Sequence, residues 1–255
     1  MSLLAGVFGV VAGHLYFYRS LATNAAGMVL HVCANTLDNA DGQLARLTRK
    51  ESRNGRIIDS VADHLGFASV YIHLALRCFL AGASPAIWVI ALGAAMSHAL
   101  QGAAADYYRT AYLYFAGGAR AEIDSSHALR SDYQKLSWTR RGWDKFLLAL
   151  YLNFTLQQEM LAPSLKKLRD VSNTAFHGRI PDWLQNRYRE AAGGMLKWWR
   201  LLMTNTRMLI LFIVLFMGQP VYYFWFELVP LNVLFIYLMV RQERMAQSLE
   251  PLVAT

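Results

Sequence analysis

Residues 38–63 read DNADGQLARLTRKESRNGRIIDSVAD, and the four aspartates in this stretch decide how the chain is interpreted. Asp38 and Asp41 lie three residues apart, and Asp59 and Asp63 lie four apart. On a helix, each spacing places both carboxylates on one face. Each pair adjoins an apolar segment and the link between the pairs is short. The sequence therefore predicts two antiparallel neighbouring helices whose carboxylates face each other at one membrane depth.

Four carboxylates at that depth would repel one another, and ionisable groups in membrane spans are usually functional. One or two divalent cations are the simplest way to stabilise them, and oxygen-only ligands favour Mg²⁺ or Mn²⁺. A hard metal beside basic residues suits a pyrophosphate. Gly42, Ala45 and Gly55 are small enough to let a phosphate approach the backbone, and Arg46 can offer it a forked contact. Close helix packing beside a basic loop is the alternative for these four residues.

Composition places the chain among membrane proteins, because 55% of its 255 residues are hydrophobic. The length suits one domain, residues 1–255. The net charge of +8 is typical of cytoplasmic loops that face anionic lipid, so nucleic acid is not expected as a partner. Cys33 and Cys78 are too few and too isolated to predict a disulfide framework or a zinc site.

Hydropathy predicts six membrane segments: Leu3–Tyr18, Leu21–Asp38, Ile57–Leu80, Pro85–Tyr107, Met203–Met217 and Val221–Val240. The uncharged links Ala81–Ser84 and Gly218–Pro220 predict tight turns. The basic loop 42–56 and both termini should be cytoplasmic. Arg77 and Arg207 fall near span ends, where long side chains can reach the headgroups.

Residues 109–206 contain only one apolar run, Phe146–Phe154, which is too short to cross a bilayer. This region is also rich in lysine and arginine. We expect one cytoplasmic insertion that is largely helical and rests partly on the membrane surface, with Trp198-Trp199-Arg200 as an interfacial anchor. The predicted fold class is therefore an all-α, integral membrane six-helix bundle with a helical cytoplasmic insertion.

The pattern D-x2-D-G-x2-A-R-x8-G-x3-D-x3-D, complete in residues 38–63, resembles the signature of the CDP-alcohol phosphatidyltransferase family. The resemblance implies a six-helix fold, a CDP-linked donor and two metal ions near the cytoplasmic face. It also implies that Asp38, Asp41 and Asp59 are metal ligands and that Asp63 is a ligand or the general base. The remaining signature residues would line the CDP pocket: Gly42, Ala45, Arg46 and Gly55.

Polar residues at the end of the fourth segment are candidates for binding the acceptor alcohol. His98, Gln101 and Asp106 fall loosely on one helical stripe, and Arg109 follows one turn later. A polar helix end at the headgroup level explains them equally well. Arg140 and Arg141 could clamp a phosphate of the acceptor, although a charge run is more often a solvated or headgroup-facing surface.

The sequence thus predicts a multi-pass membrane enzyme whose active site lies near the cytoplasmic face. Its reaction would transfer a phosphatidyl-like group from a CDP-linked donor to inositol, inositol phosphate or glycerol phosphate, releasing CMP. CDP-diacylglycerol is the favoured donor, and a headgroup as the CDP-linked moiety is the alternative. Asp63 would take the proton of the acceptor hydroxyl. An aspartate-rich membrane prenyltransferase and a non-catalytic divalent-cation carrier are the alternatives. The sequence leaves the acceptor open, and it leaves open whether the protein is a homodimer.

Overall fold

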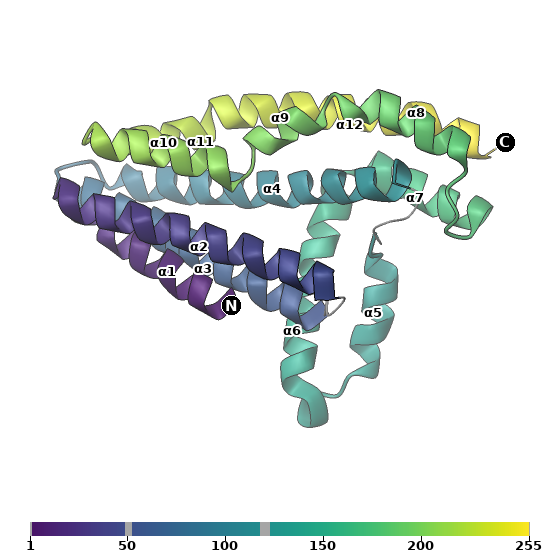
Figure 1. Ribbon diagram of the computed structural model, residues 1–255, viewed down its shortest axis with the longest axis horizontal. Coiled ribbons are helices and arrows are strands. Elements are labelled where there is room, and N and C mark those ends of the chain that lie inside the picture. The colour runs from purple at the N-terminus through teal and green to yellow at the C-terminus, as the bar shows by residue number, and fades with distance from the viewer. Residues whose placement is uncertain (1, 49–52, 118–122, 255) are drawn as a thin grey trace. The chain divides into compact units, whose positions relative to one another are not determined.

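The computed structural model describes residues 2–48, 53–117 and 123–254, and the regular elements in these ranges are all α-helices (Figure 1). This confirms the predicted all-α class. The chain divides into two compact units, one formed by Met1–His98 with Met208–Leu228 and the other by Ala99–Arg207 with Val229–Thr255. The division falls within helix α4 (Ala86–Phe115), which contributes to both units.

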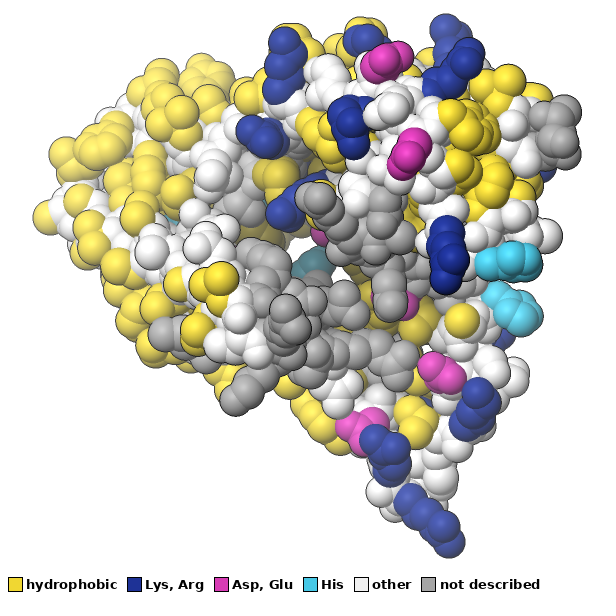
Figure 2. Space-filling view, turned by 45° about the vertical axis from the view of Figure 1, so that its right-hand side comes forward, with side chains coloured by type: hydrophobic (Ala, Val, Ile, Leu, Met, Phe, Trp, Pro, Cys, Tyr) yellow, Lys and Arg dark blue, Asp and Glu magenta, His cyan; other side chains and the backbone are white. Residues whose placement is uncertain are grey.

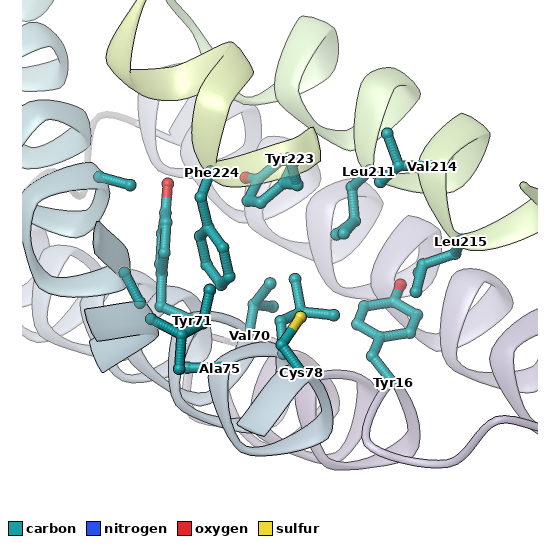
Figure 3. Packing of buried hydrophobic residues seen from close by; sticks show 14 of the residues in the cluster. Tyr16, Val70, Tyr71, Ala75, Cys78, Leu211, Val214, Leu215, Tyr223 and Phe224 are labelled. Atoms are coloured by element: carbon teal, nitrogen blue, oxygen red, sulfur yellow. The ribbon is translucent and has the colours of Figure 1, made fainter. Parts of the chain in front are cut away.

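The first unit has an aromatic and aliphatic core (Figure 3). The ring of Tyr71 lies 5.7 Å from that of Tyr223 and 6.1 Å from that of Phe224, and Tyr16 and Leu74 are fully buried. The helices that supply this unit are α1 (Ser2–Leu15), α2 (Leu21–Thr48), α3 (Arg53–Leu80), the beginning of α4, most of α10 (Thr204–Phe216) and α11 (Val221–Leu228).

Helices α1 and α3 pack with unusually close backbones because small residues line their contact. A Cβ added at Gly6 would lie 2.8 Å from the Cβ of Ala62, and one added at Gly9 would lie 3.3 Å from the Cα of Gly66. Such small-residue contacts are typical of helices that associate in membranes. Since Ala62 directly precedes Asp63, this contact fixes the part of α3 that carries the aspartates.

The tightest point of this contact is at Gly13. A Cβ there would lie 2.5 Å from the Oγ of Ser69 and 2.7 Å from the backbone nitrogen of Val70. The Ser69 hydroxyl also donates a hydrogen bond of 2.8 Å to the carbonyl of Val10. Glycine at position 13 therefore lets α1 run unbroken to Leu15 against α3.

Both predicted tight turns are present, and each uses a glycine with positive φ. Gly82 has φ of 96° and Gly218 has φ of 68°, conformations that residues with a Cβ rarely adopt. The amide of Ala83 bonds to the carbonyl of Cys78 at 3.1 Å, which satisfies a free carbonyl at the end of α3. The chain thus reverses direction after α3 and again after α10.

Arg77 and Arg207 are buried, so the prediction that they reach the headgroups is wrong. Arg77 donates hydrogen bonds of 3.0 Å to the carbonyls of both Tyr16 and Tyr18, just after the end of α1. Arg207 donates to the side chain of Gln101 at 2.6 Å. Each arginine lies on the inner face of its helix. Its hydrogen-bond acceptors are therefore backbone carbonyls or the Gln101 side-chain amide inside the protein, and not lipid headgroups.

The second unit confirms that the insertion is largely helical. It contains α5 (Ser126–Lys135), α6 (Trp138–Leu161), α7 (Pro163–Phe176), α8 (Asp182–Gly193), α9 (Leu196–Leu201), α12 (Pro230–Ala254) and the end of α4. Helix α4 continues to Phe115, eight residues beyond the predicted end at Tyr107, and the predicted apolar run lies inside α6. Helix α12 packs against α7 and α8.

Glu243 of α12 holds the start of α7. Its carboxylate accepts hydrogen bonds from the backbone nitrogen of Ser164 at 2.7 Å and from the hydroxyl of Tyr108 at 2.9 Å. A carboxylate at a helix N-terminus satisfies free amides and interacts favourably with the helix dipole. Trp199 packs 4.8 Å from the Tyr108 ring and is buried, so it is part of this interior and not an interfacial anchor. Trp198 and Arg200 are exposed, so their role as an anchor remains a prediction.

Two helical segments in the described part of the chain are long and apolar enough to cross a membrane, Ala86–Phe115 and Val221–Val253. Ser2–Leu15 and Thr204–Phe216 are apolar but shorter. Helices α2 and α3 have 28 residues each, but their aspartates and basic residues reduce their average hydropathy. The apolar helices indicate a membrane location, and the count of six spans is not confirmed.

Replacing Gly13 with alanine should destabilise the first unit by about 1–3 kcal/mol, because the added methyl group collides with backbone atoms of α3 that cannot rotate away. Gly102 of α4 is the matched control, since an added Cβ there meets no atom within 4 Å. Gly102→Ala should be neutral or slightly stabilising. Thermal unfolding in detergent micelles measures both, and equal stability of the two variants would contradict the close contact.

Glu159 of α6 is nearly fully buried and is the centre of an ion-paired cluster in the second unit. Its carboxylate accepts hydrogen bonds from the hydroxyl of Ser126 at 2.6 Å and from its amide at 3.0 Å. It pairs with Lys166 at 2.8 Å and with Arg169 at 3.1 Å. Burial alone would raise the pKa of Glu159, but the hydrogen bonds and the charge of Arg169 together lower this pKa to about 2.

Because the folded-state pKa of Glu159 lies below the unfolded value, its ionised form stabilises the protein fully above about pH 4.5. That contribution, on the order of 3 kcal/mol, should disappear as the pH falls from 4.5 toward 2. We expect the difference in unfolding free energy between the wild type and Glu159→Gln to be large at pH 7 and to shrink below pH 4.5. A difference that is constant with pH would show that the carboxylate is not the titrating group.

Candidate functional site

The four aspartates of the signature lie on two helices of the first unit. Asp38 and Asp41 belong to α2, and Asp59 and Asp63 belong to α3. The two helices lie side by side and run in opposite directions (Figure 1). Each pair occupies one face of its helix because its members are three or four residues apart.

Three of the carboxylates lie together. Asp38 lies beside Asp59 and within the electrostatic range of Asp63, and Asp59 and Asp63 also interact with each other. Asp38 and Asp59 are partly buried, whereas Asp63 is exposed. Like charges this close repel strongly when water is scarce, so the arrangement favours a cation between them.

Asp41 points toward α1 instead. Its Oδ2 accepts hydrogen bonds from the amide of Ser2 at 3.0 Å and from the hydroxyl of Ser2 at 2.6 Å. Among the described residues, no three side chains of the metal-binding types are gathered closely enough to hold an ion. The sequence did not predict this contact, because the amide and hydroxyl of a serine at the start of a helix can donate hydrogen bonds to many different acceptors.

The residues nevertheless suit a divalent ion by chemistry and by backbone position. All four candidate ligands are carboxylates, the ligand type that hard cations prefer, and Asp38, Asp59 and Asp63 interact electrostatically without being gathered into a closed ligand set. The fourth, Asp41, lies one helical turn from Asp38 and could join them only by leaving Ser2. The expected ligand set Asp38, Asp41, Asp59 and Asp63 remains a prediction.

The expected CDP-binding residues follow the aspartates along the same two helices. Gly42 and Ala45 are partly buried and continue the face of α2 that carries Asp38. Gly55 is exposed in the first turn of α3. The side chain of Arg46 lies outside the described part of the structure, so its contact with a phosphate remains a prediction.

The acceptor candidates are divided between the two units, and His98 alone shares a unit with the aspartates. His98 is buried, its Nδ1 lies 3.2 Å from the hydroxyl of Tyr71, and its ring lies 4.3 Å from that of Phe67. Gln101 is fully buried. Its side-chain amide nitrogen donates to Asn232 at 2.8 Å, and its amide oxygen accepts a hydrogen bond from Arg207. Both residues therefore have partners inside their own unit.

The other candidates are exposed. Asp106 and Arg109 lie on the last turns of α4, and Asp106 accepts a hydrogen bond of 3.2 Å from Gln158. Arg140 and Arg141 lie at the start of α6, where Arg141 pairs with Asp144 at 2.8 Å. These residues are accessible to a ligand.

Comparison with known proteins identifies the class of the matched region. Residues 1–115, which run to the end of α4, match the model of the CDP-alcohol phosphatidyltransferase family. This match confirms the resemblance carried by the signature and supports an enzyme, since the members of that family are phosphatidyltransferases that use divalent metal ions. No curated protein and no solved structure matches the chain.

Asp41 can serve as an anchor for α1, as a metal ligand, or as both, and two substitutions separate these roles. Ser2→Ala removes one hydrogen bond and should lower the free energy of unfolding by about 1 kcal/mol while Mn²⁺ binding is unchanged. Asp41→Asn should reduce both stability and Mn²⁺ affinity. Thermal unfolding and Mn²⁺ titration followed by electron paramagnetic resonance measure the two effects. Unchanged Mn²⁺ affinity in Asp41→Asn would limit this residue to anchoring α1.

Proposed function

We propose that the protein transfers a phosphatidyl-like group from CDP-diacylglycerol to a small alcohol and releases CMP. The observation that carries the proposal is the complete signature on α2 and α3, with the carboxylates of Asp38, Asp59 and Asp63 close together. The family match supports phosphatidyl transfer from a CDP-linked substrate as the class of reaction.

The donor would bind along α2 and the start of α3. Gly42, Ala45 and Gly55 leave room for the cytidine and its pyrophosphate, and Arg46 supplies positive charge. The signature aspartates would hold two Mg²⁺ or Mn²⁺ ions, which neutralise charge on the pyrophosphate and on the leaving CMP. The acyl chains would enter sideways from the bilayer, with the site near the cytoplasmic face.

Asp63 is our candidate for the general base. It is exposed, whereas the other three aspartates are partly buried, so an acceptor hydroxyl can reach it. Its carboxylate takes the hydroxyl proton as the acceptor oxygen attacks the phosphorus that carries the lipid. The bond between that phosphorus and the oxygen bridging to CMP then breaks. The products are the new phosphodiester and CMP, and the proton on Asp63 is released to water.

The acceptor we favour is a polyol or its phosphate, such as inositol, inositol phosphate or glycerol phosphate. The many lysines and arginines of residues 109–206 favour a phosphorylated acceptor. Among the candidate residues, Asp106 and Arg109 are accessible, whereas His98 and Gln101 would act by shaping the helix that carries them.

The alternative enzyme is a membrane prenyltransferase, and the alternative from another class is a divalent-cation carrier. The family match and the residues Gly42, Ala45, Arg46 and Gly55 favour the cytidine enzyme. The products distinguish the three functions directly. Phosphatidyl transfer releases CMP, prenyl transfer releases pyrophosphate, and a carrier moves metal without consuming nucleotide.

The test uses the purified chain, labelled CDP-diacylglycerol, Mn²⁺ and a panel of acceptor alcohols. We expect CMP and a labelled phospholipid to form in equal amounts with one acceptor, and no turnover in chelator. Asp63→Asn should bind CDP-diacylglycerol while its rate falls by roughly a hundred- to ten-thousand-fold, the usual cost of losing a general base. Asp59→Asn is the matched variant that should lose Mn²⁺ and donor binding together. Loss of donor binding in Asp63→Asn as well would make this residue a metal ligand.

A further inference from the structure

Helices α5 and α6 form a hairpin whose tip extends away from α8 and α12 (Figure 1). Only Leu136 and Ser137 join the two helices. The Nζ of Lys145 donates to the carbonyl of Leu136 at 2.7 Å and lies 4.6 Å from the centre of the Tyr133 ring. These contacts tie the start of α6 to the end of α5.

The tip exposes large apolar side chains. Trp138 is 55% exposed and Trp143 is 65% exposed. Phe146 and Leu150 continue from Trp143 at intervals of three and four residues, so the three side chains form one stripe along α6. The Trp143 and Phe146 rings lie 5.8 Å apart. A cluster of this kind is rarely left in water and usually marks a surface that binds something.

Basic residues outnumber acidic ones in the segment that forms the tip. Residues 130–145 contain five of them and only two acidic residues, an excess of three positive charges: Arg130, Lys135, Arg140, Arg141 and Lys145 against Asp132 and Asp144. Lysine and arginine side chains lie on the lower projection in Figure 2, with acidic side chains among them. The tip therefore combines exposed tryptophans with positive charge.

We propose that the tip of the α5–α6 hairpin docks onto the bilayer surface, with Trp138, Trp143 and Phe146 at the level of the headgroups. The occupant is anionic lipid, because tryptophan is favoured at that depth and the surrounding charge is complementary. Arg140 and Arg141 bind lipid phosphates in this arrangement. The apolar helices of the chain keep the bilayer close, so docking costs little translational entropy.

The inference rests on the membrane location of the chain and not on the reaction. It gives the insertion a role that the family match, which ends at residue 115, does not cover. A second copy of the chain or another protein could also cover the stripe. Either of these would shield it from lipid and from water alike, and this difference makes the proposal testable.

The experiment places a spin label on the full-length chain in vesicles of phosphatidylcholine and phosphatidylglycerol. Cys33 and Cys78 are first replaced by alanine, and the label is attached to Trp143→Cys. We expect the label to collide more often with oxygen, which enters lipid, than with a water-soluble nickel complex. His127→Cys, at the exposed far end of α5, is the matched control and should show the opposite preference.

Two results would overturn the proposal. A Trp143→Cys label that prefers the nickel complex lies in water, and one that is shielded from both reagents lies against protein. Removing phosphatidylglycerol, or combining Arg140→Gln with Arg141→Gln, should raise nickel accessibility at least threefold, since each basic residue near an anionic surface contributes a several-fold preference. No change in either case would rule out anionic lipid as the occupant. The readout is independent of turnover, so failure here is distinct from failure of the proposed reaction.

Discussion

Repulsion among the carboxylates of α2 and α3 is the constraint on which the rest of the first unit depends. Asp38, Asp59 and Asp63 lie close together at one end of two largely apolar helices, where charges interact more strongly than in water. Such an arrangement persists only if the helices are held in place by other contacts. The glycine contact between α1 and α3 does this for Asp59 and Asp63, because Ala62 lies inside it. The pairing of Ser2 with Asp41 links α1 to the other aspartate-bearing helix.

The sequence predicted the approach of Asp38 to the aspartates of α3 because this geometry is local. Spacings of three and four residues place carboxylates on one face wherever a helix forms, and the short link between α2 and α3 brings the two faces together. The position of Asp41 could not be predicted in this way. It depends on where α1 lies along α2 and α3, and that register is set by the contacts of Gly6, Gly9 and Gly13 with residues far away in the sequence.

Residues near the ends of the predicted spans show a second point that the sequence could not predict. Arg77, Arg207 and Trp199 were assigned to the headgroup region, but the structure buries all three. Hydropathy cannot separate these environments, because a headgroup layer and a polar pocket inside a protein both suit a long or amphipathic side chain. Only the tertiary partners decide, and these are the carbonyls of Tyr16 and Tyr18 for Arg77 and the Tyr108 ring for Trp199.

The charges of the second unit fall into two groups with different physical roles. Glu159 and Arg169 are buried and paired at 3.1 Å. Their charges compensate each other and hold α6 against α7, so they do not attract a ligand from solution. At the hairpin tip the basic residues are mostly exposed, and the two aspartates there balance only part of their charge. An unbalanced charge in water contributes little to folding, since surface ion pairs are worth at most about 1 kcal/mol. The unbalanced positive charge does attract an anionic surface. The neighbouring tryptophans add to this attraction, because their transfer from water to the headgroup region is favourable. The same sixteen residues, 130–145, therefore contribute less to the stability of the unit than to its attraction for lipid.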